Sequence, residues 1–232
     1  MLAKKKAVTL IELLIAMGIL ALLSVILFSV FNVSLRAWKK ADNIFKANTI
    51  ARVVLDRMSR EISSAIIVNG SNDFYCLGID STSSDKLRTN SIGDEFYFIA
   101  ALNPNLDNDR SDLCEVGFWL DGQNAADYEL MRFYVTDDRV SGPPVDFNFN
   151  FSSGASNQLS DNITDLQITY YDDNGIAKNS WGAVNSSGVP ITTDGVPSKI
   201  EISITVQIGM GTQATNPEFY QNTYTATISF LQ

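Results

Sequence analysis

The chain contains no histidine and only two cysteines in 232 residues. The lack of histidine excludes His-dependent general base catalysis, Ser-His-Asp and Cys-His arrangements, and His-rich transition-metal sites. Two widely spaced cysteines do not make a zinc site, and no glycine-rich phosphate loop is present. Adjacent acids, such as Asp172 and Asp173, lie in turn sequences, where carboxylates are usually solvated. We therefore expect neither an enzyme nor a cofactor.

The N-terminal region consists of one long apolar stretch. Between Ala7 and Leu35 the only charged residue is Glu12. At about 1.5 Å per helical residue, this stretch is long enough to cross a hydrocarbon core of roughly 30 Å. It is also longer than the apolar region of a cleaved secretory signal. We expect a membrane helix that stays with the protein.

Glu12 is the exception within this stretch, because a lone carboxylate in a spanning helix is costly and marks a functional candidate. It ends the sequence Lys4-Lys5-Lys6-Ala7-Val8-Thr9-Leu10-Ile11-Glu12. This segment resembles the leader and mature start of type IV prepilins and type II secretion pseudopilins. In that family a basic leader is followed by Gly, an aromatic residue and Thr-Leu-Ile-Glu, so Ala7 and Val8 depart from the preferred pair.

The resemblance implies specific roles for four residues. A prepilin peptidase would cut after Ala7, and the new amine of Val8 would be methylated. Thr9 and Glu12 would serve assembly, with Glu12 meeting the positive N-terminus of an adjacent subunit. The residues alone also allow a simpler alternative, in which Glu12 snorkels to the headgroups beside the lysine cluster.

Charge is distributed unevenly along the chain. Residues 1–61 contain ten Lys and Arg against four Asp and Glu, a net charge of +6, whereas the remainder carries −15. An acidic head argues against a nucleic-acid partner, and it fits either general solubility or an acidic docking face. Lys4, Lys5 and Lys6 favour a cytoplasmic N-terminus, although Arg36 and the two lysines after it act against that bias. The resemblance favours the same orientation, a single pass of the inner membrane with the head in the periplasm.

The helical pattern continues beyond Leu35. Apolar residues recur three or four apart as far as Ile66, opposite a charged face, which predicts one helix over 8–68, ended by Asn69-Gly70-Ser71. Asp56 with Arg60 and Arg57 with Glu61 form i,i+4 pairs. Residues 50–65 resemble the spine of J-type minor pseudopilins and W-type minor pilins, which packs on an antiparallel sheet. A helix lying on the membrane surface is the alternative.

After residue 70 the pattern changes to short alternating runs separated by turn residues. We predict turns at Asp121-Gly122, Asp137-Asp138 and Asp173-Asn174-Gly175. The predicted strands cover 74–79, 95–101, 115–120, 128–135, 146–151, 163–171, 199–208 and 224–231. The expected fold is therefore α+β and type IV pilin-like, with a long N-terminal helix on a mainly antiparallel β head. The expected divisions are a leader at 1–7, a transmembrane half at 8–35, an amphipathic spine at 36–68 and a periplasmic head at 69–232.

The last third of the chain extends the resemblance. A strand ending in Tyr170-Tyr171-Asp172, a loop with Trp181 and a strand led by Pro197 are similar to the C-terminal arrangement of J-type pseudopilins. Trp181 is either a loop anchor that fills a gap or a recognition residue.

The sequence also suggests a possible disulfide and a possible calcium site. Cys76 and Cys114 either form a disulfide, which the exported compartment permits, or stay unpaired in the core. The acidic loop with Asp107, Asp109 and Asp112 has alternating oxygen ligands, but it lacks the Gly and the final acid of an EF-hand loop. An ordinary acidic loop is therefore preferred over a calcium site.

The resemblance implies a minor pseudopilin of a type II secretion system, a structural subunit at the pseudopilus tip that helps to initiate assembly and export. Its partners would be other minor pseudopilins or pilins, prepilin peptidase and the inner membrane. One alternative is a minor pilin that primes a type IV pilus for adhesion, motility or DNA uptake. A second alternative is a membrane-tethered extracytoplasmic binding domain.

Overall fold

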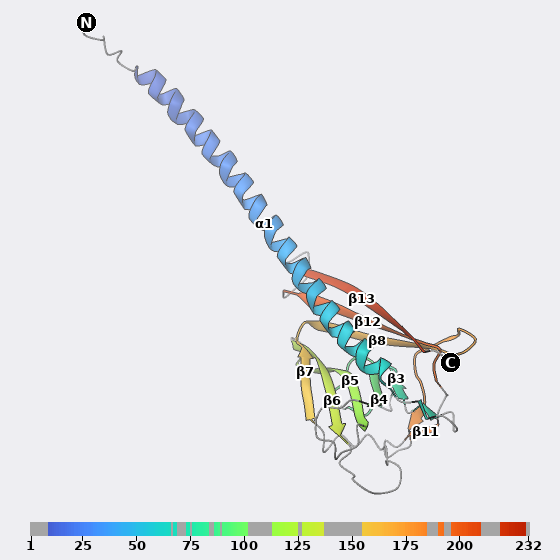
Figure 1. Cartoon of the computed structure of the whole chain (residues 1–232). Coiled ribbons are helices and arrows are strands. Elements are labelled where there is room, and N and C mark those ends of the chain that lie inside the picture. The colour runs from blue at the N-terminus through green and yellow to red at the C-terminus, as the bar shows by residue number, and fades with distance from the viewer. Residues whose placement is uncertain are drawn as a thin grey trace. The chain divides into compact units, whose positions relative to one another are not determined.

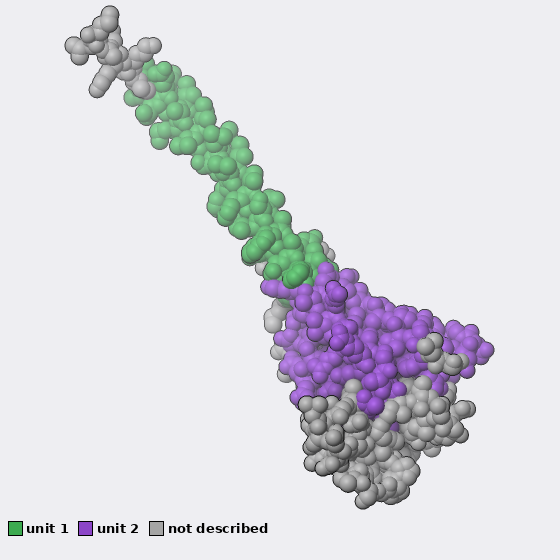
Figure 2. All heavy atoms as spheres, in the orientation of Figure 1, with its two compact units in different colours: residues 1–45, 209–220 green, residues 46–208, 221–232 purple. Residues whose placement is uncertain are grey.

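The structure, a computed structural model, describes residues 9–65, 67–68, 73–74, 76–83, 86–88, 90–101, 113–124, 127–136, 155–184, 190–192, 196–209 and 219–230. The chain divides into two compact units (Figure 2). The helical unit comprises residues 1–45 and 209–220, and the β-rich unit comprises residues 46–208 and 221–232.

One helix, α1, runs from Leu10 to Ser63 (Figure 1). The predicted end at residue 68 is wrong, because Ala65 already forms an antiparallel bridge with Ala100. The carbonyl of Ser64 accepts a hydrogen bond from the amide of Ala101 at 3.1 Å. The apolar residues after Ser63 continue the helical spacing, but long-range pairing with the sheet takes the chain out of the helix. The predicted stop at residues 69–71 lies outside the described residues.

The remaining elements are strands. Their bounds are β1 Ile67–Val68, β2 Asp73–Phe74, β3 Cys76–Ile79, β4 Glu95–Ala101, β5 Leu113–Asn124, β6 Asp127–Thr136, β7 Ala155–Ser160, β8 Ile163–Tyr171, β9 Ala177–Lys178, β10 Ala183–Val184, β11 Pro190–Thr192, β12 Lys199–Ile208 and β13 Tyr220–Ser229. A five-stranded sheet has the order β3-β4-β5-β6-β7, and a four-stranded sheet has the order β13-β12-β8-β9. Two short two-stranded pairs, β1-β2 and β10-β11, complete the described strands. The prediction of a long N-terminal helix followed by antiparallel sheets is confirmed.

The second half of α1 packs within the β-rich unit. Its buried face consists of Ala47, Ala51, Val54, Leu55, Met58, Glu61 and Ile62. Ala47 and Ala51 are 0% and 1% exposed, and their small side chains allow a close approach to neighbouring backbone. The hydroxyl of Tyr224 in β13 donates to Asn48 Oδ1 at 2.6 Å. The helix spine therefore contributes directly to the core of this unit, as its amphipathic pattern predicts.

An aromatic cluster joins the two larger sheets. The register places Phe96, Phe98 and Phe118 on one face of the five-stranded sheet. Phe96 lies 5.0 Å from Phe98 and 5.9 Å from Tyr170 of β8, measured between ring centroids. Tyr170 in turn lies 5.9 Å from Trp181. Burial of these rings supplies a large share of the apolar area that stabilises this unit.

Trp181 is a loop anchor in this structure. It is 2% exposed, and it exchanges two backbone hydrogen bonds with Gly78, of 2.8 and 3.0 Å. A Cβ atom at Gly78 would lie 2.2 Å from the Tyr170 hydroxyl, so glycine is needed for this close approach. Of the two roles that the sequence left open, the structure supports the anchor.

Two strand predictions need correction. Asp121-Gly122 is not a turn but part of β5, which continues to Asn124 with a register shift against β6. The amide of Gly122 donates to the carbonyl of Asn90 at 2.9 Å, and Ile92 covers the glycine, so a neighbouring segment holds this stretch extended. The predicted strand 74–79 corresponds to β2 and β3, and the polar strand β7 was not predicted.

The strand at 146–151 and the turn at Asp137-Asp138 lie outside the described residues. The turn at Asp173-Asn174-Gly175 is confirmed, with Gly175 at φ 74°.

Candidate functional site

The site indicated by the sequence lies at the start of α1, where Thr9 and Glu12 bond to each other. The Glu12 amide donates to Thr9 Oγ1 at 3.3 Å. Glu12 Oε2 accepts from the Thr9 amide at 2.9 Å and from the Thr9 hydroxyl at 3.0 Å. This reciprocal arrangement is a capping box, in which an N-cap Thr and a Glu three residues later satisfy amides that the helix leaves unpaired. Ala7 and Val8 lie outside the described residues.

The capping box gives Glu12 a local role that our sequence interpretation missed. The Thr-x-x-Glu spacing before an apolar run was the available signal. A carboxylate in the first helical turn is also favoured by the positive end of the helix dipole. Glu12 thus helps to define where α1 begins.

The segment after Glu12 presents apolar side chains to its surroundings. An 18-residue window of α1 has a mean hydropathy of 2.8, and none of it is buried within the structure. By length and composition this part of α1 is able to cross a membrane. Ser24 and Ser34 do not interrupt it, because their hydroxyls donate to the carbonyls of Leu20 and Val30 at 2.8 and 2.9 Å. Such bonds satisfy polar groups that would otherwise be costly in hydrocarbon.

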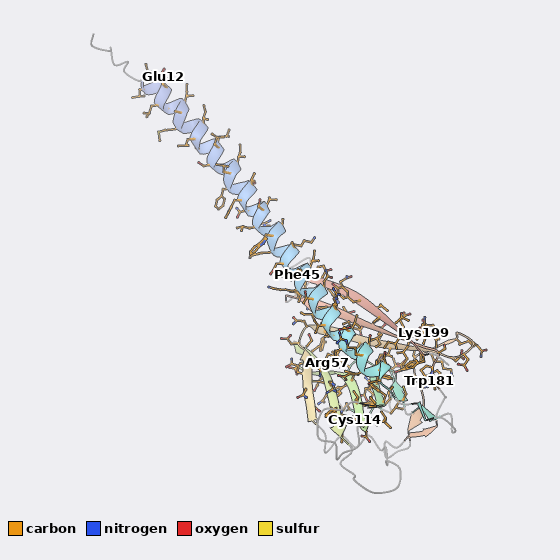
Figure 3. All side chains as sticks on the ribbon, viewed as in Figure 1. Glu12, Phe45, Arg57, Cys114, Trp181 and Lys199 are labelled. Carbon is orange, nitrogen blue, oxygen red and sulfur yellow. The ribbon has the colours of Figure 1, made fainter. Side chains whose placement is uncertain are left out.

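A second cluster of charged side chains lies in the β-rich unit. Arg132 Nε of β6 donates to Glu61 Oε2 of α1 at 2.8 Å, and both side chains are about one-tenth exposed. Arg57 donates to the other oxygen of Glu61 at 3.1 Å, which confirms the predicted i,i+4 pair. The Asp56 and Arg60 pair is also confirmed, at 2.6 Å on the exposed side. Figure 3 labels Arg57 on the part of the helix beside the strands.

The ion pair with Arg132 explains why a charged residue, Glu61, lies on the buried face of α1. Its partner lies 71 residues away in sequence, so helical spacing gives no signal for the contact. A buried, hydrogen-bonded ion pair contributes little net stability but is costly to break. The pair therefore fixes α1 to β6 at one defined position.

Two buried carboxylates hold the segment before β4 against the sheets. Asp94 accepts backbone hydrogen bonds from Ser81 and Ile168, at 2.8 and 2.7 Å. Glu95 accepts from the amides of Leu87 and Arg88, at 2.9 and 3.2 Å. Burial raises the pKa of both carboxyl groups from their ordinary values, while these hydrogen bonds act in the opposite direction. Because their oxygens are engaged by backbone amides, Asp94 and Glu95 act as structural links between segments.

The acidic turn at Asp172 is also structural. Asp172 Oδ1 accepts from the amides of Asn174 and Ile176, both at 2.9 Å. Among the described residues no group of three or more Cys, Asp and Glu side chains is placed to hold a metal ion. The candidate calcium ligands Asp107, Asp109 and Asp112 lie outside those residues.

The structure does not bring the two cysteines together. Cys76 in β3 lies opposite Phe98, and Cys114 in β5 lies opposite Ala100, so β4 separates them. Two strand spacings amount to roughly 10 Å, whereas a disulfide needs Cα atoms within about 7 Å. Both cysteines are free and buried, and burial raises the pKa of the Cys76 thiol well above its ordinary value. This geometry favours the unpaired alternative over the disulfide.

Residues 2–28 match the family model described as the prokaryotic N-terminal methylation motif. No curated protein matches the chain. Among solved structures, the chain is similar to a type IV-like pilin from Thermus thermophilus, with a TM-score of 0.40 and 10% identity, over 82% of this chain and 95% of that chain.

The motif match spans residues 2–7, for which a leader is predicted, the Thr9–Glu12 capping box and much of the apolar segment. It agrees with the resemblance drawn from the residues themselves. The chain carries the N-terminal methylation motif of prepilin-type proteins at the start of a long apolar helix that leads into antiparallel sheets.

Proposed function

We propose that this protein is a minor pseudopilin of a type II secretion system, a non-enzymatic subunit that helps to initiate pseudopilus assembly and export. The observation that carries the proposal is the methylation motif at residues 2–28, which covers the start of an exposed apolar helix. A helix of this kind is stable only in lipid or against other apolar helices. Both surroundings are available to a subunit that moves from a membrane into a filament.

Glu12 is the proposed assembly contact. On cleavage after Ala7, the amine of Val8 becomes the N-terminus, and Glu12 of one subunit meets that positive charge on its neighbour. Two unit charges about 4 Å apart attract by about 4 kcal/mol at an effective dielectric near 20. The capping box keeps the carboxylate hydrogen-bonded before that partner is present.

Substitution of Glu12 separates its two roles. Gln at this position keeps an acceptor for the capping box but removes the charge, whereas Val removes both. We expect E12Q and E12V to insert into the membrane equally well and to lose copurification with partner subunits. Unchanged copurification of E12Q would refute the charge contact, and loss in E12V alone would assign the effect to the cap.

Processing is tested by mass spectrometry of the N-terminus. The expected product begins with N-methyl-Val8, after removal of residues 1–7 by prepilin peptidase. An intact Met1 in functional protein would contradict the assembly proposal. The same proposal places the N-terminus in the cytoplasm and residues 69–232 in the periplasm, with 8–35 in the inner membrane.

A minor pilin that primes a type IV pilus is the second candidate, because the same motif and helix serve both systems. Copurification with components of a secretion channel, or instead with components of a pilus, distinguishes the two. The third candidate is a membrane-tethered binding domain. In that case, uncleaved protein with a substituted Glu12 should keep its function.

A further inference from the structure

The edges of the two larger sheets differ in how well they are protected. Exposed strand edges attract other strands, and proteins usually shorten them, bend them, charge them or cover them. Edge strand β3 has four residues, and Gly78 within it is bonded to Trp181. Edge strand β7 has six residues and a register shift against β6, and β9 has two residues that include Lys178.

Among the described residues, edge strand β13 is neither short nor charged. It has ten residues, with no charged residue, no proline and no glycine. Thr223, Thr225 and Thr227 are exposed. Within the part of the chain that the structure describes, β12 is its one strand neighbour. Figure 1 shows β13 at the margin of its sheet, beyond β12 and β8.

Hydroxyl groups already link β13 to the rest of the sheet on one face. Thr225 bonds to Ser203, and Thr223 bonds to Thr205, both at 2.9 Å between oxygens. The residue number rises along β12 while it falls along β13, so the two strands are antiparallel. A further antiparallel strand beside β13 would extend the same row of hydroxyls, and cross-strand Thr pairs are favourable.

The sequence of β13 is complementary to itself. With Thr225 opposite Thr225 of a second copy, Thr223 lies opposite Thr227 and Gln221 lies opposite Ser229. On the face that carries these threonines, each exposed residue of one strand then meets a polar, uncharged residue of the other, whereas Asn222 lies opposite the apolar Ile228. This pairing has no like charges to oppose it, and about one backbone hydrogen bond forms per residue pair.

Charge favours this surface for contact between two copies. The chain has a net charge of −9, and the acids are concentrated after residue 61. Contacts between acidic surfaces of identical molecules are unfavourable. An uncharged strand ten residues long avoids that repulsion.

We infer that β13 is a self-association edge, through which two copies of this chain pair antiparallel about Thr225 to form one continuous sheet.

Cysteine cross-linking tests the register directly in the full chain, purified in detergent micelles. Opposed residues in antiparallel strands have Cα atoms about 4.5 to 5.5 Å apart, which suits a disulfide. We expect T225C to give a dimer on a nonreducing gel after mild oxidation. Wild type is the first control, since its two cysteines are buried. The second is S156C on edge strand β7, where Ser156 is exposed. Equal cross-linking of S156C and T225C, or none of T225C, would overturn the inference.

Variants of opposite charge at Thr225 distinguish lost pairing from failed folding, because two folded variants should pair with each other. Sedimentation of the full chain in micelles should show that T225K and T225E each self-associate roughly fivefold more weakly, because like charges then lie directly opposite. An equimolar mixture of T225K and T225E should recover a dimer. A monomeric wild type, or a mixture that stays monomeric while wild type dimerises, would contradict pairing at this edge.

Pairing through β13 does not require the proposed assembly contact of Glu12. T225C cross-linking should persist in E12V, whereas copurification with other pilin subunits is expected to be lost there. Loss of the T225C cross-link in E12V would refute β13 as an independent association surface.

Discussion

Residues 10–33 and 46–63 belong to one helix, yet their side chains meet different surroundings. In the first stretch the large apolar residues are 50–81% exposed, and in the second the apolar residues of the packed face are 0–8% exposed. Both stretches contain good helix formers, so helix propensity does not separate them. The distribution of charge does, because the first stretch has only Glu12 while the second carries charges opposite its packed face. Four predictions test this contrast, from the largest expected effect to the smallest.

The first prediction concerns the charge on the packed face. R132A should lower the free energy of unfolding by about 3 kcal/mol, because among the described residues it leaves the buried Glu61 with Arg57 as its one ionic partner. Urea titration of the full chain in micelles, followed by tryptophan fluorescence, measures this change. The matched control is R60A, which breaks the exposed Asp56 pair and should cost about 0.5 kcal/mol. Equal losses in the two variants would contradict a special role for the buried pair.

The second prediction applies one substitution to both stretches of the helix. M58A should destabilise the β-rich unit by about 2–3 kcal/mol, since Met58 is 0% exposed and its removal leaves a cavity. M17A should leave the unfolding transition unchanged, because Met17 is 64% exposed and its truncation leaves no cavity. The same titration measures both variants. A comparable shift in M17A would show that the exposed stretch contributes to the folding of the β-rich unit.

The third prediction concerns pH. Because the pKa of Glu95 is raised in the folded state, the unfolded chain loses this proton first as pH rises above about 4. The stability that Glu95 contributes is present below its unfolded pKa and is lost as pH rises through its folded pKa. E95Q should therefore reduce the fall in unfolding free energy between pH 4 and 7.

The control is a variant of Asp80, whose contribution to stability should depend on pH in the opposite direction. Hydrogen bonds from Thr82 lower the pKa of Asp80, so its contribution is present at neutral pH and is lost as pH falls. D80N should therefore remove the part of the fall in unfolding free energy at low pH that is due to Asp80. Urea titrations at four pH values measure both variants, and parallel curves for wild type and E95Q would exclude Glu95 as a source of the dependence.

The fourth prediction is the absence of an effect. Since β4 separates Cys76 from Cys114, a reductant should leave the urea midpoint unchanged. Thiol labelling without reductant should count no reactive thiol in the folded chain and two after unfolding. A count of zero in unfolded protein would reveal a disulfide and contradict the strand order.

The accuracy of prediction from sequence varied with the kind of signal. Strands β8 and β12 begin and end where their alternation predicts, because one face of each is mainly buried. Strand β4 also has its predicted bounds, but it is an apolar run that is buried on both faces. The polar strand β7 lacks that alternation, and only its pairing with β6 makes it a strand. At the candidate site, the motif around Glu12 was visible in the sequence, whereas the capping box was overlooked despite a clear local spacing.

The sequence by itself determined the features that depend on neighbours a few residues apart: the apolar stretch, the helix, the alternating strands and the methylation motif. Only the tertiary structure decided the contacts that join distant segments. Glu61 meets Arg132 across 71 residues, and Asp94 meets the amide of Ile168 across 74. The physical reason is that periodicity records which face of an element is buried, whereas the partner on that face depends on the order and register of the strands.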